Sequence, residues 1–261
     1  MNRWECANMN EMNKYAEKAM MYDMLAQFYK YSDPQKHVMY YQKHLNAMQK
    51  WIYSMQYQAP RLPQTQLEPG MSRVRVIHAS PDAPAVDIYV NGKLTLQNVK
   101  YKEISDYLQL PAGQYRVDIY AAGTTNRPVL SDMYMLLPGI TYTIAAAGNL
   151  SSLRLIPFVD RTFVPAGEAS VKFVHLSPDA PSVDIAVKNG DILFKDVPFL
   201  EATKNIKVTP GKVDLEVRVA GTDNVVLTVP KVQFKADTSY TIFAVGFANG
   251  TPQLEVLTAI G

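Results

Sequence analysis

Two seven-residue stretches of the sequence carry residue types that could do chemistry. Residues 78–84 read HASPDAP, and residues 175–181 read HLSPDAP. A histidine, a serine and an aspartate within five residues could serve as the base, nucleophile and orienting carboxylate of a hydrolase. The same residue types could instead build a structural corner. The elements that carry the two stretches decide between these hypotheses.

Hydrophobic alternation places both histidines on an inward, apolar face. Side chains two apart on a strand point the same way, so each histidine follows two apolar residues: Val74 and Val76 before His78, and Val171 and Phe173 before His175. A neutral inward histidine can hydrogen-bond turn backbone that would otherwise be buried unpaired. The letters SPDA fit a type I turn, and the last proline keeps the residue before it extended. We therefore expect two structural corners, formed by His78, Ser80, Pro81, Asp82, Pro84 and Asp87, and by His175, Ser177, Pro178, Asp179, Pro181 and Asp184. The two last aspartates, Asp87 and Asp184, are expected to face outward or toward the sheet edge.

A catalytic role for these corners is disfavoured by spacing. His78 and Ser80 stand roughly 6.5 Å apart while the strand stays extended, whereas a base must lie within about 3 Å of its nucleophile. No G-x-S-x-G nucleophile elbow occurs in the chain. We predict no catalytic residue and no enzyme. A transthyretin-like hydrolase remains a remote alternative, and it requires that His78→Ala abolish turnover.

Ligand binding is the stronger alternative. Asp82, Asp87, Asp179 and Asp184 are weak candidates for Ca²⁺ ligands, since they lack the clustered Asp and Asn residues of a calcium loop. A carbohydrate platform could use tyrosines of the first repeat, but the second repeat has Ala186 and Arg218 where the first has Tyr89 and Tyr120. His37 and His44 are expected to be solvated residues rather than zinc ligands. No cofactor is predicted, and no nucleotide-binding motif is present.

The corners belong to two copies of one unit. VRVIHASPDAPAVDIYVNG at 74–92 matches VKFVHLSPDAPSVDIAVKNG at 171–190 with one insertion. Each unit, 72–157 and 169–261, shows about seven short alternating strands with turn residues every 8–12 positions. The pattern predicts a mainly β chain with two tandem antiparallel β-sandwich domains of immunoglobulin- or transthyretin-like kind, joined by a linker at 158–168. The sequence leaves open whether the two sandwiches pack rigidly.

Residues 1–57 contain no glycine and predict an antiparallel helical hairpin, followed by a proline-rich linker at 58–71. Asp33 and Pro34 fit the N-cap and first position of the second helix. That helix carries an apolar seam at spacings of three and four residues: Val38, Tyr41, Leu45, Met48, Ile52 and Met55. Two helices cannot enclose a core alone, so this interaction seam must meet a sandwich or another chain.

Bulk composition narrows the possible partners. A net charge of +2 gives no reason to expect nucleic acid. Cys6 is the single cysteine, so it could form only an intermolecular bridge. The first twenty residues contain no apolar run of the signal-peptide kind, and the uncharged stretch 133–153 reads as two buried strands rather than a membrane span.

The repeated HASPDAP and HLSPDAP signature resembles the bacterial family known as domain of unknown function 4397. The resemblance begins at Arg73 and implies β-sandwich repeats on secreted or surface-attached proteins, with no established activity. The Met- and Tyr-rich hairpin looks similar to segments of spore coat proteins. We therefore expect a non-enzymatic structural or interaction protein of a bacterial cell or spore surface, self-associating or docking onto another surface or coat protein. Cytoplasmic location is the alternative.

Overall fold

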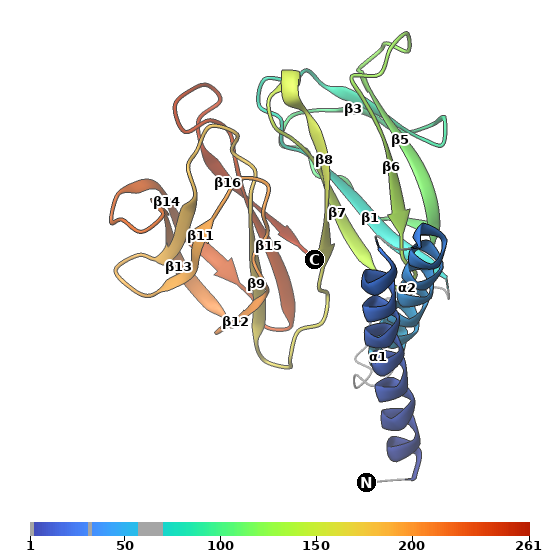
Figure 1. Ribbon diagram of the computed structural model, residues 1–261. Coiled ribbons are helices and arrows are strands. Elements are labelled where there is room, and N and C mark those ends of the chain that lie inside the picture. Colours follow the sequence, from blue (N-terminus) through green and yellow to red (C-terminus); the bar gives the residue numbers. More distant parts are fainter. Residues whose placement is uncertain (1–2, 31–32, 57–69) are drawn as a thin grey trace. The chain divides into compact units, whose positions relative to one another are not determined.

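The computed structural model describes residues 3–30, 33–56 and 70–261 (Figure 1). Contacts divide the chain into two compact units, Met1–Gln66 and Leu67–Gly261, which are described separately below. In the described residues the first unit contains two helices, and the second contains sixteen strands in four sheets. The predicted fold class, mainly β with an N-terminal helical hairpin, is confirmed.

The first unit is a hairpin of α1 (Arg3–Tyr29) and α2 (Pro34–Gln56). Asp33 caps α2 as predicted: its Oδ1 accepts a hydrogen bond from the backbone N–H of Lys36 at 3.1 Å. Among the described residues, neither helix is long and apolar enough to cross a membrane. The side chains of Cys6, Ile52 and Met55 lie outside the described part of the chain.

The two helices meet through small and polar residues rather than through the predicted seam. Ala19 and Ala26 are buried, and each presents its backbone carbonyl to a histidine ring of α2. His44 Nδ1 lies 2.9 Å from Ala19 O, and His37 Nδ1 lies 2.8 Å from Ala26 O. The interpretation of these histidines as solvated flank residues was wrong. Alanine side chains let the helices approach closely enough for an imidazole to reach the facing backbone.

A ladder of lysine–tyrosine contacts runs beside those histidines. The ammonium groups of α2 lie 5.0 to 6.0 Å from the ring centroids of tyrosines on α1, in the pairs Lys36–Tyr29, Lys43–Tyr22 and Lys50–Tyr15. Members of each set are seven residues apart, which is two helical turns. These contacts and the histidine contacts fix one face of each helix against the other.

The second unit contains two sandwiches with the same strand order. The strands of the first are β1 (Met71–His78), β2 (Val86–Val90), β3 (Lys93–Val99), β4 (Leu108–Pro111), β5 (Gly113–Ala121), β6 (Leu130–Leu136), β7 (Thr141–Ala147) and β8 (Arg154–Asp160), with a 3₁₀ turn η1 (Leu150–Ser152). The strands of the second are β9 (Ala169–His175), β10 (Val183–Val187), β11 (Ile192–Val197), β12 (Ile206–Val208), β13 (Gly211–Val219), β14 (Val225–Phe234), β15 (Thr238–Val245) and β16 (Glu255–Ile260). Strand β8 therefore extends three residues into the predicted 158–168 linker.

Each sandwich is built from two four-stranded sheets. Sheet A (β4-β1-β7-β8) faces sheet B (β3-β2-β5-β6), and sheet C (β12-β9-β15-β16) faces sheet D (β11-β10-β13-β14). One pair in each sandwich is parallel, β1 with β7 and β9 with β15, while the other pairs are antiparallel. Inward residues of both sheets form one core per sandwich, around Val76, Ile88 and Ile144 in the first and Phe173, Ile185 and Ile242 in the second.

The central strands of sheets A and C, namely β1, β7, β9 and β15, are buried on both faces. Their second faces form a third apolar cluster that contains residues of both sandwiches, including Ile77 and Phe158 from the first and Val174, Leu176 and Phe243 from the second. The order of layers is therefore B, A, C, D, with sheets A and C adjacent in the middle of the strand-containing unit (Figure 1). The two sandwiches share one packed interface.

Candidate functional sites: the repeated corners and the buried interface

Each corner histidine holds the two ends of its turn. His78 Nε2 lies 3.0 Å from Pro84 O, and the backbone N–H of Ser80 points at His78 Nδ1 from 3.4 Å. His175 makes the same contacts, 3.1 Å to Pro181 O and 3.3 Å to Ser177 N. Since Nδ1 accepts, Nε2 carries the proton and donates, so both rings are neutral. The histidines thus lie inward and bind turn backbone, as a structural corner requires.

The serine hydroxyls do not face the histidines. Ser80 Oγ donates to Asp82 Oδ1 at 3.4 Å, and Ser177 Oγ donates to Asp179 Oδ1 at 3.4 Å. Burial lowers the pKa of both His78 and His175, with the backbone hydrogen bond opposing that effect in each case. Neither corner brings a hydroxyl and an imidazole together as a nucleophile and its base.

Asp82 and Asp179 tie each corner to a distant loop of its sandwich, the one that follows β7 or β15. Asp82 Oδ1 accepts from the backbone N–H of Leu150 at 2.8 Å. Asp179 accepts from two backbone N–H groups, Ala248 to Oδ1 at 2.7 Å and Asn249 to Oδ2 at 2.9 Å. Backbone N–H groups that point at a carboxylate present positive charge to the oxygens that a cation would need. Within the described residues, no group of three or more histidine, cysteine or acidic side chains is placed to hold a metal.

Asp87 and Asp184 are buried clamps, not outward-facing charges. Asp87 Oδ1 accepts from Asn98 N at 2.7 Å and Oδ2 from Gly123 N at 2.9 Å. Asp184 does the same with Asp196 N and Gly221 N at 2.7 and 2.9 Å. One of the two N–H groups in each case lies where the pairing is irregular, between β2 and β3 or between β10 and β11. The other lies in the turn that follows β5 or β13. The expectation of an outward or edge position was wrong because these loops cover the carboxylates.

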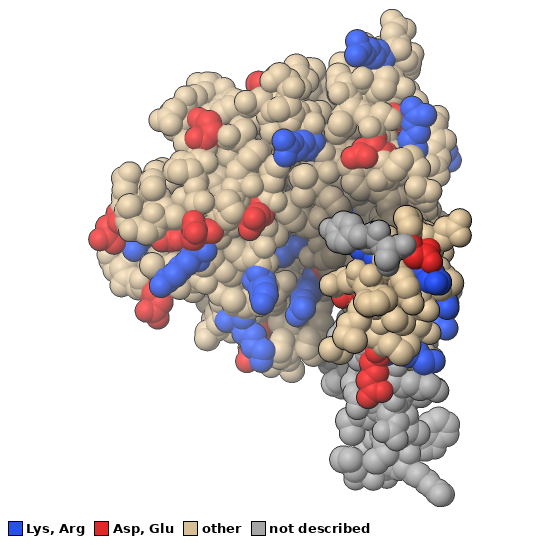
Figure 2. Space-filling model, in the orientation of Figure 1, with Lys and Arg blue, Asp and Glu red and all other residues tan. Residues whose placement is uncertain are grey.

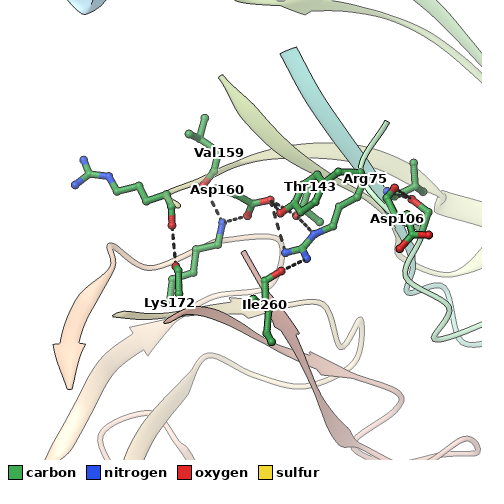
Figure 3. Close-up of polar contacts among 12 residues, drawn as sticks. Arg75, Asp106, Thr143, Val159, Asp160, Lys172 and Ile260 are labelled. Atoms are coloured by element: carbon green, nitrogen blue, oxygen red, sulfur yellow. Dashed lines mark hydrogen bonds and ion pairs between the residues drawn. The ribbon is translucent and has the colours of Figure 1, made fainter. Parts of the chain in front are cut away.

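The interface between the sandwiches contains a buried charged cluster that sequence reasoning missed (Figure 3). Its centre is Asp160, at the end of β8. Lys172 Nζ lies 2.7 Å from Asp160 Oδ1, Arg75 Nη2 lies 3.7 Å from Oδ2, and Tyr107 donates its hydroxyl to Oδ2 at 2.8 Å. Thr143 also donates to Oδ2. The side chains of Arg75, Asp160 and Lys172 are each at most 4% exposed, so the interface buries two cations and one carboxylate.

The two cations reach across the interface in a reciprocal way. Lys172, from the second sandwich, donates to Val159 O of the first at 2.8 Å, and Arg75, from the first, donates to Ile260 O of the second at 2.6 Å. Val159 pairs with Tyr142 and Ile260 with Tyr240, so the two acceptors occupy equivalent positions. Reciprocal contacts of this kind are typical of two-fold related subunits. The repeats differ at the next position, which is Asp160 in the first and Gly261 in the second. The second repeat therefore supplies no carboxylate at this position, and Asp160 pairs with both cations.

Two sequence signals could have revealed this interface. Arg75 and Lys172 occupy the same position of the repeated stretch, on the strand face opposite the corner histidine. The strands TIAAA (143–147) and TIFAV (241–245) are nearly continuous apolar runs, which indicate burial on both faces. In the sequence analysis, the first of these runs served only to exclude a membrane span.

The interaction seam of the hairpin is exposed. Val38, Tyr41 and Leu45 are 44% to 53% exposed on α2. On α1, Met20, Met24 and Phe28 are at least 70% exposed. Met48 is half-buried. The apolar faces of both helices therefore point away from the helix–helix contact, and they are called the seam faces below.

A family model described as "Domain of unknown function (DUF4397)" matches residues 72–186. The chain is similar to this family over its first sandwich and the beginning of the second. No curated protein matches the sequence.

Two solved structures are similar in part. The C-terminal domain of AlgF from P. aeruginosa is 18% identical, with a TM-score of 0.29, over 36% of this chain and 99% of that domain. The Bacillus anthracis TIE protein is 14% identical, with a TM-score of 0.21, over 71% of this chain and only 37% of that protein. Both TM-scores lie below 0.5, so neither likeness bears on the function of this chain.

Proposed function

We propose that this chain is a non-enzymatic structural or interaction protein of a bacterial outer layer. The double sandwich serves as a rigid building block, and the hairpin joins copies of the chain. The corners support a non-enzymatic role, because their histidines and aspartates are occupied with backbone hydrogen bonds. The similarity to the DUF4397 family supports the surface location only by analogy. The face that Figure 2 shows carries both basic and acidic side chains.

The observation that carries the proposal is the pair of seam faces. Six large apolar side chains on the seam faces are exposed: Met20, Met24, Phe28, Val38, Tyr41 and Leu45. Exposed contiguous apolar surface of this kind marks an interaction site. We infer that a second hairpin covers it, since two hairpins joined through such faces make a four-helix bundle with an enclosed core. The spacing of three and four residues along α2 suits that packing.

Light scattering on the full chain tests this. A variant with Met24→Glu and Leu45→Glu places one charge on each seam face, and we expect it to be monomeric where the unaltered chain is at least dimeric. Gln42→Glu, at an exposed polar position of α2, is the matched control and should associate as the unaltered chain does. A monomeric unaltered chain at high concentration would remove the main support for assembly.

A second experiment locates the contact. A chain that starts at Gly70 lacks the hairpin and should be monomeric. If it associates as strongly as the full chain, the edges of the sandwiches drive assembly instead. The thermal unfolding of all variants is measured alongside, so that a folding defect is not mistaken for a loss of association.

A surface carbohydrate-binding role is the second candidate, because one observation favours it. The rings of Tyr89 and Tyr120 lie 5.1 Å apart, edge to face, on the free face of sheet B. The equivalent positions of sheet D hold Ala186 and Arg218. Binding to a glycan array that is lost in Tyr89→Ala with Tyr120→Ala would favour this role; no binding by the unaltered chain removes it.

A further inference from the structure

The core of the first sandwich contains a cavity. It has a volume of about 40 Å³, lies between sheets A and B, and is lined entirely by apolar surface. Protein interiors contain few voids larger than a water molecule, and a void of this size lowers stability. Purely apolar cavities stay free of water, because a water molecule there has no hydrogen-bond partner. The cavity is thus dry, and it lowers the stability of the first sandwich unless an apolar group fills it.

The second sandwich carries a larger side chain, phenylalanine, at three of the positions that line this cavity. The three positions concerned are Val76, Leu96 and Leu136 in the first sandwich and Phe173, Phe194 and Phe234 in the second. Strand register fixes the equivalence: Ile88 pairs with Leu96 as Ile185 pairs with Phe194, and Gly113 pairs with Leu136 as Gly211 pairs with Phe234. Each phenylalanine of the second sandwich is at most 6% exposed.

The first sandwich has larger residues at two other lining positions, but their hydroxyls are held away from the core. Tyr115 and Tyr134 stand where the second sandwich has Val213 and Val232. The Tyr115 hydroxyl donates to Pro111 O at 2.7 Å, and the Tyr134 hydroxyl donates to Leu155 O at 2.9 Å. Both rings are half-buried and fixed by these bonds, so neither can move inward to fill the space.

One side of the cavity is less covered than the rest. Leu108 and Leu110 of β4, with Tyr115 of β5, are lining residues that are only half-buried. Strands β3 and β4 are the edge strands of their sheets and do not pair with one another. The half-buried residues of β4 and β5 mark the side from which a chain-like molecule would enter, with its polar end remaining in water.

We propose that the first sandwich binds the hydrocarbon end of a small amphipathic molecule in this cavity. The volume is only a little larger than the roughly 30 Å³ that a water molecule occupies in the liquid, so it admits the last one or two carbon atoms of a chain. The lining offers no hydrogen-bond partner, so the polar group of the ligand lies outside the core. The second sandwich binds no such ligand, because its phenylalanines occupy the space. This inference does not depend on the assembly role of the hairpin.

Titration of the methyl-labelled full chain with hexanoate, followed by NMR, tests the proposal. We expect saturable shifts of the Leu96, Leu108 and Leu136 methyl groups, with the Ile185 and Val217 methyl groups of the second sandwich unchanged. Xenon serves as a probe without a polar end. Binding of xenon without hexanoate would overturn the amphipathic ligand and leave only a closed cavity. Absence of any saturable shift would overturn the site.

Filling variants provide the matched control. Leu96→Phe and Leu136→Phe, made separately, give the first sandwich residues that the second already tolerates. We expect each to weaken hexanoate binding at least tenfold while keeping or raising the thermal unfolding temperature. Val76→Ile is the milder variant if either fails to fold. Undiminished binding in a folded filling variant would place the ligand elsewhere and overturn the proposal.

Discussion

Arg75 and Lys172 hold the same position in the two repeats, and both pair with the carboxylate of Asp160, Arg75 within the first sandwich and Lys172 from across the interface. A buried ion pair contributes little to stability by itself, but removal of one partner is costly because a charge remains without compensation. Two cations share the single carboxylate of Asp160 here. Its removal would therefore leave both cations without a counter-charge and would lower the free energy of unfolding more than the loss of either cation. Burial lowers the pKa of Lys172, and the nearby Asp160 opposes that shift.

The first prediction concerns Asp160 itself. Asp160→Asn leaves Arg75 and Lys172 buried without a counter-charge, and we expect the free energy of unfolding to fall by about 3–5 kcal/mol. Urea unfolding followed by circular dichroism measures this. Asp223→Asn is the control, since the Asp223 side chain is fully exposed and lies 3.9 Å from Arg218; it should change stability very little. A loss of less than about 1 kcal/mol in Asp160→Asn would contradict the central role of the carboxylate.

The asymmetry of the cluster gives a companion test. Lys172→Met removes one cation and leaves the Arg75–Asp160 pair, while the methionine fills much of the space without needing a counter-charge. We therefore expect a loss of about 1–2 kcal/mol, from the hydrogen bonds to Asp160 and to Val159 O. The test is whether Asp160→Asn lowers the free energy of unfolding more than Lys172→Met does. Equal losses would mean that the lysine, not the shared carboxylate, dominates the interface.

The second prediction is a pH dependence set by the corner histidines. Burial lowers the pKa of His78 and His175 below that of an unfolded histidine, so the unfolded chain binds more protons in this range. The stability that the neutral rings provide is fully present above about pH 6.5, the unfolded pKa. It is lost as pH falls from there through the lower folded pKa values.

Unfolding measured between pH 8 and pH 5 checks this. His78→Ala should cost on the order of 1–3 kcal/mol at pH 8, because Ser80 N–H and Pro84 O lose a buried partner. The double variant with His175→Ala should flatten the pH profile between pH 6.5 and pH 5. A steep profile that persists in the double variant would assign the effect to other groups.

The third prediction concerns the buried clamps. Asp87→Ala leaves the N–H groups of Asn98 and Gly123 without acceptors, at about 1–3 kcal/mol for each group left unpaired. Asp184→Ala should cost a similar amount in the second sandwich, since it removes the same two kinds of bond. Thermal unfolding measures both. Asp106→Ala, at an exposed position, is the control and should be nearly neutral.

The fourth prediction is that calcium at millimolar concentration leaves the unfolding temperature unchanged. The oxygens of Asp82 and Asp179 already accept backbone N–H groups, whose dipoles oppose a bound cation. Calorimetry with and without calcium is the measurement, with magnesium as a control for ionic strength. A calcium-specific rise that disappears in Asp82→Ala with Asp179→Ala would instead establish a calcium site at the corners.

Local patterns predicted the sandwiches and the corners because each depends on short-range information. Alternation along β1 placed His78 inward, and the order of Ser80, Pro81 and Asp82 specified the turn. The faces that pack between distant segments were harder to predict. The local sequence predicts an exposed Arg75, because nothing in it indicates that a second sandwich covers this face. The residues near Arg75 also give no sign that Asp160 is its partner. The clamp of Asp87 was missed for the same reason, since its two N–H donors lie 11 and 36 residues away.

The helix–helix contact of the hairpin could not be predicted from the sequence, for a different reason. The seam at Val38, Tyr41 and Leu45 was found from its apolar spacing, but hydrophobicity alone does not say which face meets the partner helix. The contact instead uses His37 and His44, one position earlier, because Ala19 and Ala26 offer close approach and backbone acceptors. The apolar faces remain exposed.

The order of layers B, A, C, D has a geometric consequence for anything that the molecule might touch. Sheets A and C cover one another, so the broad surfaces of sheets B and D look in opposite directions. One of them bears the Tyr89–Tyr120 pair and the other bears Arg218 with Glu216. The duplicated unit is thus two-sided, and its two outer surfaces are free to diverge in chemistry. Under the proposed structural role, a neighbour on each side would meet a surface of different chemistry, with a spacer four sheets thick between them.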